Sequence, residues 1–153
     1  MFRIEGTLKL PRVEAMLEQC GFEKGGRVQK AIDQAVIDYC NKGGYVPASP
    51  ERTLEFSAQL STVVGEGEVI WNTPYAHYQY MGIVYGPNHP IIDHDTGVVL
   101  GYYSPPQKKP TDRKLTYDKT QNPNAGPFWF ERMKADHLED IIRHAEAAMR
   151  GDD

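Results

Sequence analysis

Apolar residues recur with helical spacing near both ends of this chain but not in its middle. Between residues 26 and 41, Val28, Ile32, Val36 and Tyr39 follow one another at steps of three and four, which predicts an amphipathic helix. A longer stripe predicts a terminal helix over residues 128–149, and we expect it to bury Phe130, Met133, His137, Leu138, Ile141, Ile142, Ala145 and Met149. Shorter helices are expected from Pro11 to about Gly21 and over residues 75–81, where Thr73-Pro74 supplies a start and Gly82 a stop.

The middle of the chain shows period two instead. Residues 54–64 place Leu54, Phe56, Ala58, Leu60, Thr62 and Val64 on alternate positions. This pattern predicts a half-buried antiparallel strand, although its first turn could be helical. Gly65-Glu66-Gly67 then predicts a turn, with a second strand over residues 68–72.

Residues 83–126 have no helical period and are rich in Pro, Gly and Asn. Residues 90–93 and 97–103 flank the turn sequence Asp95-Thr96-Gly97, which predicts a β-hairpin. We expect residues 104–126 to form a mobile basic arm, since so long a segment without helix or strand is uncommon inside a compact domain.

These elements predict an α+β fold, with a small antiparallel sheet and N-terminal and C-terminal helices packed on one face. We expect a single domain over residues 1–153. Its core would comprise about 11–82 and 126–149, with a hairpin and arm inserted at about 83–125.

Charge is distributed unevenly along the sequence. The chain has 17 basic and 21 acidic residues, a net charge of −4, which argues against a dedicated nucleic-acid-binding protein. Residues 61–104 contain no Lys or Arg, whereas residues 105–120 carry Lys108, Lys109, Arg113, Lys114 and Lys119. Separate acidic and basic regions favour side-by-side packing with copies of the same chain, although a solvated surface with uneven charge is the alternative.

Other features of the sequence suggest a soluble intracellular domain. No apolar run approaches the length of about 20 residues that a membrane helix needs, and Met1–Glu5 lacks the apolar core of a signal peptide. Cys20 and Cys40 form no C-x-x-C pair, so we expect partly buried thiols in a reducing compartment.

One polar cluster has the composition of a metal site. His89, Asp93, His94 and Asp95 could hold Zn²⁺ or Mn²⁺ and activate water, as in a metal-dependent hydrolase. The alternative is that Asp93 and Asp95 build the hairpin turn, where Asp is common for backbone reasons. Because no nucleotide-binding loop, H-E-x-x-H or G-x-S-x-G sequence occurs, we expect no enzyme activity, catalytic residues or cofactor. We also expect His137 to pack or be half-exposed rather than catalytic.

Aromatic residues form two groups. Tyr75, Tyr78, Tyr80 and Tyr85 follow Trp71, and Phe128, Trp129 and Phe130 are consecutive. Three adjacent aromatic side chains fan around a helix by about 100° per residue, so they cannot all face one core. We expect these groups to serve core packing or contacts with a partner.

Four short motifs of the chain are Gly25-Gly26-x-Val28-Gln29, Tyr45-Val46-Pro47, Thr73-Pro74-Tyr75-Ala76-x-Tyr78-Gln79-Tyr80 and Gly126-Pro127-x-Trp129-Phe130-Glu131-Arg132. Together they resemble the minor capsid proteins of siphophages that infect Gram-positive hosts. This resemblance covers about residues 25–149, and these proteins are similar in turn to tail-completion proteins of the phage neck, which have an α+β fold.

The resemblance implies a structural protein of the virion at the head–tail junction, present in the host cytoplasm during assembly. Its implied partners are copies of itself in a ring, expected to be a hexamer, and the neighbouring neck and tail proteins. DNA would pass through the ring as cargo, and no membrane is involved. The basic residues Lys108, Lys109, Arg113 and Lys114 could then reach an acidic neighbour. A host-encoded binding module that uses the aromatic surface is a further alternative.

Overall fold

The structure is a computed structural model that describes residues 11–49 and 51–151. Its helices and strands follow the order α1 (Pro11–Gln19), α2 (Arg27–Lys42), α3 (Thr53–Ser61), α4 (Ala76–Met81), β1 (Ile83–Gly86), β2 (His89–Ile92), β3 (Val99–Tyr103), β4 (Lys109–Lys114) and α5 (Trp129–Arg150). The predicted α+β class, with antiparallel strands between N-terminal and C-terminal helices, is confirmed.

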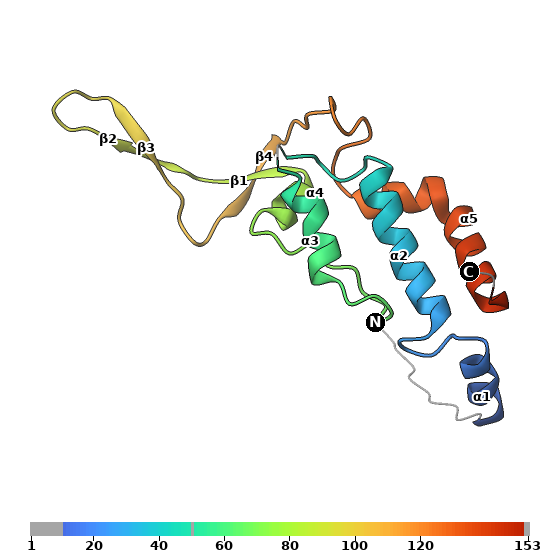
Figure 1. The fold of residues 1–153 in the computed structure, drawn as a ribbon. Helices are drawn as coiled ribbons and strands as arrows, with labels where there is room; N and C mark the ends of the chain where they lie inside the picture. The colour runs from blue at the N-terminus through green and yellow to red at the C-terminus, as the bar shows by residue number, and fades with distance from the viewer. Residues whose placement is uncertain (1–10, 50, 152–153) are drawn as a thin grey trace, which may run out of the picture.

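The core lies between α2 and α5, which run antiparallel along each other (Figure 1). Val36 and Cys40 of α2 and Trp129, Met133 and Ile141 of α5 are buried there. Both helices were predicted from their apolar period, and burial of these stripes is what stabilises them. Burial also raises the pKa of the Cys40 thiol to about 12, so this cysteine is an unreactive part of the core.

Two buried polar side chains hold the long loops against the helices. The Asp33 carboxylate on α2 accepts hydrogen bonds from the backbone N–H groups of Gly65 and Gly67, at 2.7 and 3.0 Å. The Asn122 amide donates to the Val46 carbonyl at 2.7 Å and to the Glu55 carboxylate of α3. Each bond joins segments that are far apart in the sequence, and each satisfies polar groups that would otherwise be costly to bury.

The strand predicted over residues 54–64 is wrong, because residues 53–61 form the helix α3. Leu54 and Ala58, four residues apart, face the core, whereas Phe56 and Leu60 are exposed. At the start of the helix, the Ser49 hydroxyl accepts a hydrogen bond from the Thr53 N–H at 3.0 Å, which satisfies the first N–H group of α3. Residues 68–72 form no strand either, and Ile70 instead donates its N–H to the Thr62 hydroxyl at 3.0 Å.

The strands form a long antiparallel ribbon that projects from the helices (Figure 1). The predicted hairpin is confirmed as β2 paired with β3. The expected mobile arm over residues 104–126 is wrong in part, because residues 109–114 form β4 and pair with β1. Residues Ile83 and Lys114 are partners in this pairing, which sequence alone did not indicate because the two strands are distant in the chain and β4 has few strand-favouring residues.

The buried stripe of α5 also differs from the prediction. Met133 and Ile141 are buried as expected, and Trp129 is buried although it was not part of the predicted stripe. Phe130, His137 and Ala145 are half-buried. Leu138, Ile142 and Met149 are exposed, because a single neighbouring helix, α2, covers only a narrow face of α5.

Candidate functional site

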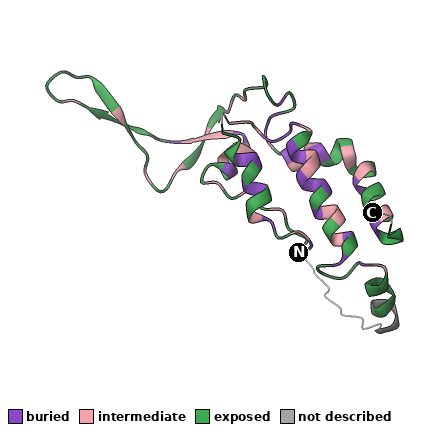
Figure 2. Cartoon of the chain, viewed as in Figure 1, coloured by how far each residue is buried: buried purple, intermediate pink, exposed green. Residues whose placement is uncertain are grey.

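The outer half of the ribbon is an apolar surface without cover. We call residues 83–114 the ribbon, residues 93–97 its tip, and β1 with residues 108–114 its root. Between tip and root, seven large apolar side chains are exposed, namely Ile91, Ile92, Val98, Val99, Leu100, Tyr102 and Tyr103. Figure 2 shows the outer ribbon almost entirely as exposed surface, in contrast to the helices. An exposed apolar surface of this size is typical of a protein–protein contact.

Both faces of the ribbon carry these apolar residues. Tyr103 is paired with His89 and Tyr102 with Pro90, with no register shift between the two pairs. Paired residues place their side chains on the same face and successive residues place them on opposite faces, so Tyr102 and Tyr103 point to opposite faces. A strand with one wet face alternates apolar and polar residues, whereas one covered on both faces has a continuous apolar run such as Val98–Tyr103. Within the described residues neither face of this run is covered.

The tip is a tight turn built by Asp93. Its carboxylate accepts hydrogen bonds from the backbone N–H groups of Asp95 and Thr96, both at 2.9 Å. The N–H of Gly97, at φ +70°, donates to the Asp93 carbonyl at 2.8 Å. The bonds from Thr96 and Asp95 lower the pKa of the Asp93 carboxyl, which keeps the tip negatively charged at neutral pH.

The four residues of the alternative metal site are not all close together. Asp93, His94 and Asp95 belong to the turn, and His89 lies at the other end of β2, paired with Tyr103. The part of the chain that the structure describes contains no group of three His, Cys, Asp or Glu side chains placed to hold a metal ion. The Asp93 carboxylate instead accepts the hydrogen bonds of the hairpin turn, which was the alternative to a metal site.

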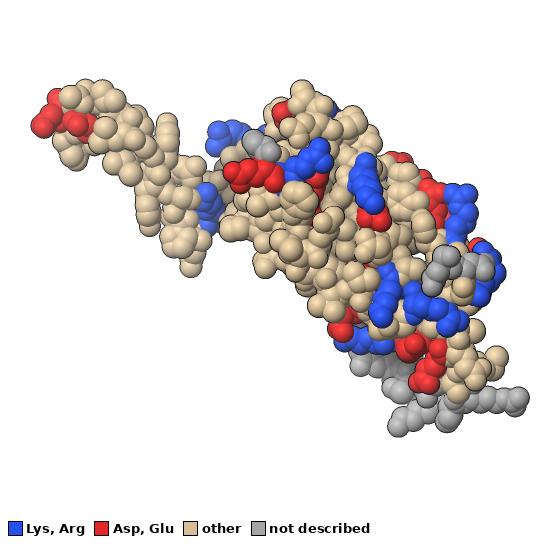
Figure 3. All heavy atoms as spheres, viewed as in Figure 1, with Lys and Arg blue, Asp and Glu red and all other residues tan. Residues whose placement is uncertain are grey.

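Charge changes sign along the ribbon. Figure 3 shows acidic atoms at its far end, uncharged atoms along its middle, and basic atoms where it meets the helices. The acidic residues of the tip are Asp93 and Asp95. The root carries the basic residues Lys108, Lys109, Arg113 and Lys114 and one acidic residue, Asp112, so basic residues predominate there. Lys109, Arg113 and Lys114 are exposed on β4, and Lys108 just before it is half-buried.

Aromatic rings attach the ribbon to the helical core. Tyr80, at the end of α4, packs edge to face against Phe128 and Trp129, with ring centroids 5.4 and 4.7 Å apart. Trp129 in turn contacts Trp71 at 5.7 Å. The N–H of Phe128 donates to the Tyr80 carbonyl at 2.9 Å. The aromatic residues predicted as packing or partner contacts thus divide, with Trp129 buried in the core and Phe128 half-exposed beside Tyr80.

Two tyrosines meet where the ribbon leaves the helices. Tyr78 contacts Tyr85 of β1, with ring centroids 4.7 Å apart, and both are half-buried. Tyr75 is exposed. The Tyr117 hydroxyl donates to the Gln79 carbonyl at 2.5 Å, which fastens the chain leaving β4 to α4.

Gly82, between α4 and β1, allows the chain to enter the ribbon. Its φ is +70°, and a Cβ at this position would lie 2.7 Å from the Pro127 side chain. Only glycine adopts this backbone without strain and leaves room for Pro127. Its carbonyl accepts the N–H of Leu115 at 2.9 Å, so both strands of the root are fixed at one place.

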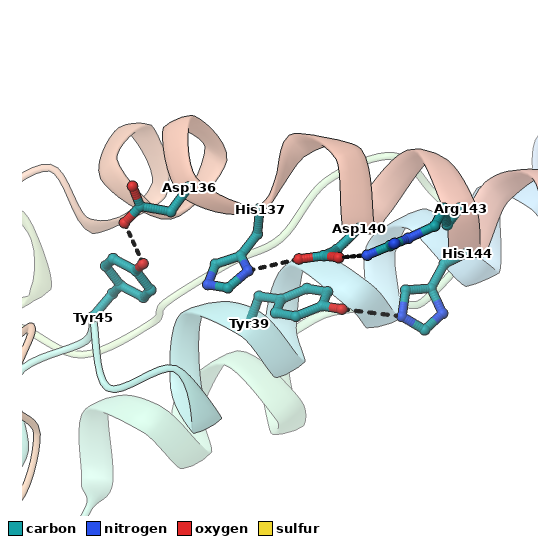
Figure 4. A network of polar contacts seen from close by, with 7 residues as sticks. All are labelled: Tyr39, Tyr45, Asp136, His137, Asp140, Arg143 and His144. Carbon is teal, nitrogen blue, oxygen red and sulfur yellow. Dashed lines mark hydrogen bonds and ion pairs between the residues drawn. The ribbon is translucent and has the colours of Figure 1, made fainter.

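A polar network joins α2 and the segment after it to α5 (Figure 4). The ring of His137 stacks on Tyr39 at 4.6 Å, and its Nδ1 lies 2.9 Å from the Asp140 carboxylate. His144 Nε2 lies 3.3 Å from the Tyr39 hydroxyl. Tyr45 donates to Asp136, and burial together with this bond raises the pKa of Tyr45 to about 12. His137 is therefore packed and half-buried, and the network serves the contact between the two helices.

A second apolar surface lies beside α2. A cavity of about 430 Å³ is lined by residues that include Ile32, Val36, Val69, Trp71 and Phe130. The indole N–H of Trp71 is buried and makes no hydrogen bond to the described residues. Phe130, the third of the consecutive aromatic residues, contributes to this cavity.

None of the helices in the described residues is long and apolar enough to cross a membrane. Comparisons of the chain with protein-family models, with curated proteins and with solved structures find no match. The candidate site rests accordingly on the geometry of this chain. Sequence reasoning located the hairpin but did not select its apolar residues as a site, although the uninterrupted run Val98–Tyr103 was the signal for it.

Proposed function

We propose that this chain is a structural subunit that assembles with copies of itself, as a minor capsid or tail-completion protein of a phage neck does. The observation that carries the proposal is the projecting ribbon with exposed apolar residues on both faces. A two-stranded ribbon is marginally stable by itself in water. Burial of its two faces against another molecule would stabilise the ribbon.

The negative net charge of the chain supports the proposal that DNA passes through the ring without being bound. The chain is acidic overall, and its ribbon carries no Lys or Arg from residue 83 to residue 107. A surface of this kind would not retain DNA by phosphate contacts. A ring of such subunits would let DNA pass as cargo, which is the role that the resemblance to neck proteins implies.

The motifs behind that resemblance have a structural explanation that is compatible with it. In the motif over residues 126–132, Trp129 is the most buried aromatic side chain, and Arg132 donates to the carbonyls of Pro127 and Asn124 at 2.7 and 2.8 Å. In the motif over residues 73–80, Tyr80 packs on Trp129. Both motifs thus build the attachment of the ribbon.

Native mass spectrometry of the purified chain, with negative-stain electron microscopy of the same sample, tests this proposal. We expect one closed assembly with a fixed number of copies, which we expect to be six, and ring-shaped particles. A chain that remains monomeric at about 100 μM, well above the Kd of ordinary specific complexes, would contradict it. A stoichiometric metal ion on a monomer would favour the metal-dependent hydrolase instead.

A further inference from the structure

The two ends of the ribbon carry opposite charge and cannot reach each other within one copy. Asp93 and Asp95 lie in the turn beyond β2 and β3, whereas Lys109, Arg113 and Lys114 lie on β4 beside the helices. Figure 1 shows the ribbon extended between these two places. The attraction between tip and root is therefore available only between molecules.

We propose that the tip of the ribbon of one copy docks against the root of the ribbon of a second copy. This inference rests on the proposed assembly of copies and names the contact that would hold them. In this contact, a second copy of this chain covers the apolar surface, and the opposite charges of tip and root favour that partner. The acidic tip finds its complement in the root, where four basic residues outnumber the single acidic residue Asp112.

Contact between two ribbons also covers their apolar middle. Leu100 and Tyr102 are 68% and 67% exposed, and both lie between the tip and the root. When a tip rests on a neighbouring root, these side chains come against the neighbouring ribbon, whose root carries Tyr85 on β1. Charge would set the direction of the contact, and apolar burial would supply most of its affinity.

The test reverses the charge of each end separately and then of both. The tip variant combines Asp93→Asn with Asp95→Lys. Asn keeps an oxygen that can accept the N–H groups of the turn, and within the described residues the Asp95 carboxylate makes no hydrogen bond. The root variant combines Lys109→Glu with Arg113→Glu, both exposed and four residues apart on β4. Glu139→Lys, exposed on α5, is the matched control for a charge reversal away from the ribbon.

Sedimentation velocity at low salt measures the association. We expect the tip variant and the root variant each to weaken it by about tenfold or more, since like charges placed together at a contact are strongly unfavourable. The variant that carries both reversals should recover most of the lost affinity, and Glu139→Lys should match the unmodified chain. Recovery in the doubly reversed variant is a result that damage to the fold would not produce.

Other results would overturn the contact, and they separate it from the proposed function. If the unmodified chain assembles and both single-end variants assemble equally well, the tip–root contact is wrong while assembly of copies stands. If each variant loses assembly and the doubly reversed variant stays dissociated, charge pairing between tip and root is wrong. If the unmodified chain does not assemble, both the contact and the proposed function fail.

Discussion

The ring of Tyr80 lies edge-on against Trp129, with centroids 4.7 Å apart, and this contact joins the helix that precedes the ribbon to the helix that ends the chain. Trp129 is 1% exposed and also contacts Trp71. The projecting ribbon is thus attached to the best-buried part of the core. A flexible attachment would leave the direction of the ribbon undefined, whereas this one fixes it.

Trp129→Ala should strongly destabilise the fold. Removing a fully buried aromatic side chain leaves a cavity, and we expect a loss of about 3–5 kcal/mol in the free energy of unfolding. Urea denaturation followed by circular dichroism measures it. Phe56→Ala, at an exposed aromatic position on α3, is the control and should cost less than about 1 kcal/mol. Equal losses in the two variants would mean that Trp129 is not a centre of the core.

Asp33→Ala should destabilise the chain by about 2–3 kcal/mol, because hydrogen bonds to a buried charged group are stronger than neutral ones. The substitution leaves the N–H groups of Gly65 and Gly67 without their acceptor. Asp33→Asn retains an oxygen for them and should cost less. Urea denaturation of both variants gives the comparison, and an alanine variant as stable as the asparagine variant would show that these bonds contribute little.

Stability should fall at high pH, and Tyr45 should contribute to the fall. The folded chain retains the Tyr45 proton up to a pKa of about 12, whereas the unfolded chain loses it near the ordinary value of 10. Below pH 10 the stabilisation is fully present. Between pH 10 and 12 the unfolded state binds fewer protons, so the free energy of unfolding decreases by up to about 1.4 kcal/mol per pH unit for this group.

Tyr45→Phe isolates that contribution. Cys40 titrates in the same direction, with a pKa raised from 9 to about 12 by burial, so the unmodified chain loses stability from both groups. Urea denaturation at several values between pH 9 and 12 should give a shallower decrease for Tyr45→Phe. Parallel curves for the two proteins would be inconsistent with a raised pKa at Tyr45.

Zn²⁺ or Mn²⁺ added to the protein should show no saturable one-to-one binding in isothermal titration calorimetry. Asp93 is engaged in its turn, and His89 lies at the opposite end of β2. His94→Ala should behave like the unmodified chain in the same titration. A single tight site that is lost in His94→Ala would instead restore the metal-dependent hydrolase as the better interpretation.

The long helices and the hairpin could be predicted from local sequence because each has one dominant period. Residues 54–61 could not, since a short segment with Leu54 and Ala58 four residues apart satisfies both period two and a helical period. Contact with α2 and the hydrogen bond from the Thr53 N–H to the Ser49 hydroxyl favour the helix. The β1–β4 pairing depends on Gly82 and Tyr117, which bring distant segments together.

The candidate site was only partly visible in the sequence. Charge reversal between residues 61–104 and 105–120 indicated separate acidic and basic regions. That these regions occupy opposite ends of one ribbon follows from the register of the strands, which the sequence does not encode locally. Leu138 and Ile142 were predicted to be buried but are exposed. An apolar stripe at helical spacing predicts a helix, but it does not predict how much of the stripe a neighbouring element covers.

Hydrogen–deuterium exchange of the ribbon at low and high protein concentration tests most directly whether it is the element that joins copies. In the dilute chain, the amides of β2 and β3 have no cover from the described residues and should exchange rapidly. We predict that residues 89–103 gain protection of about tenfold or more as the chain assembles, while the core amides of α2 are unchanged. Assembly that leaves exchange in residues 89–103 unaltered would contradict the account.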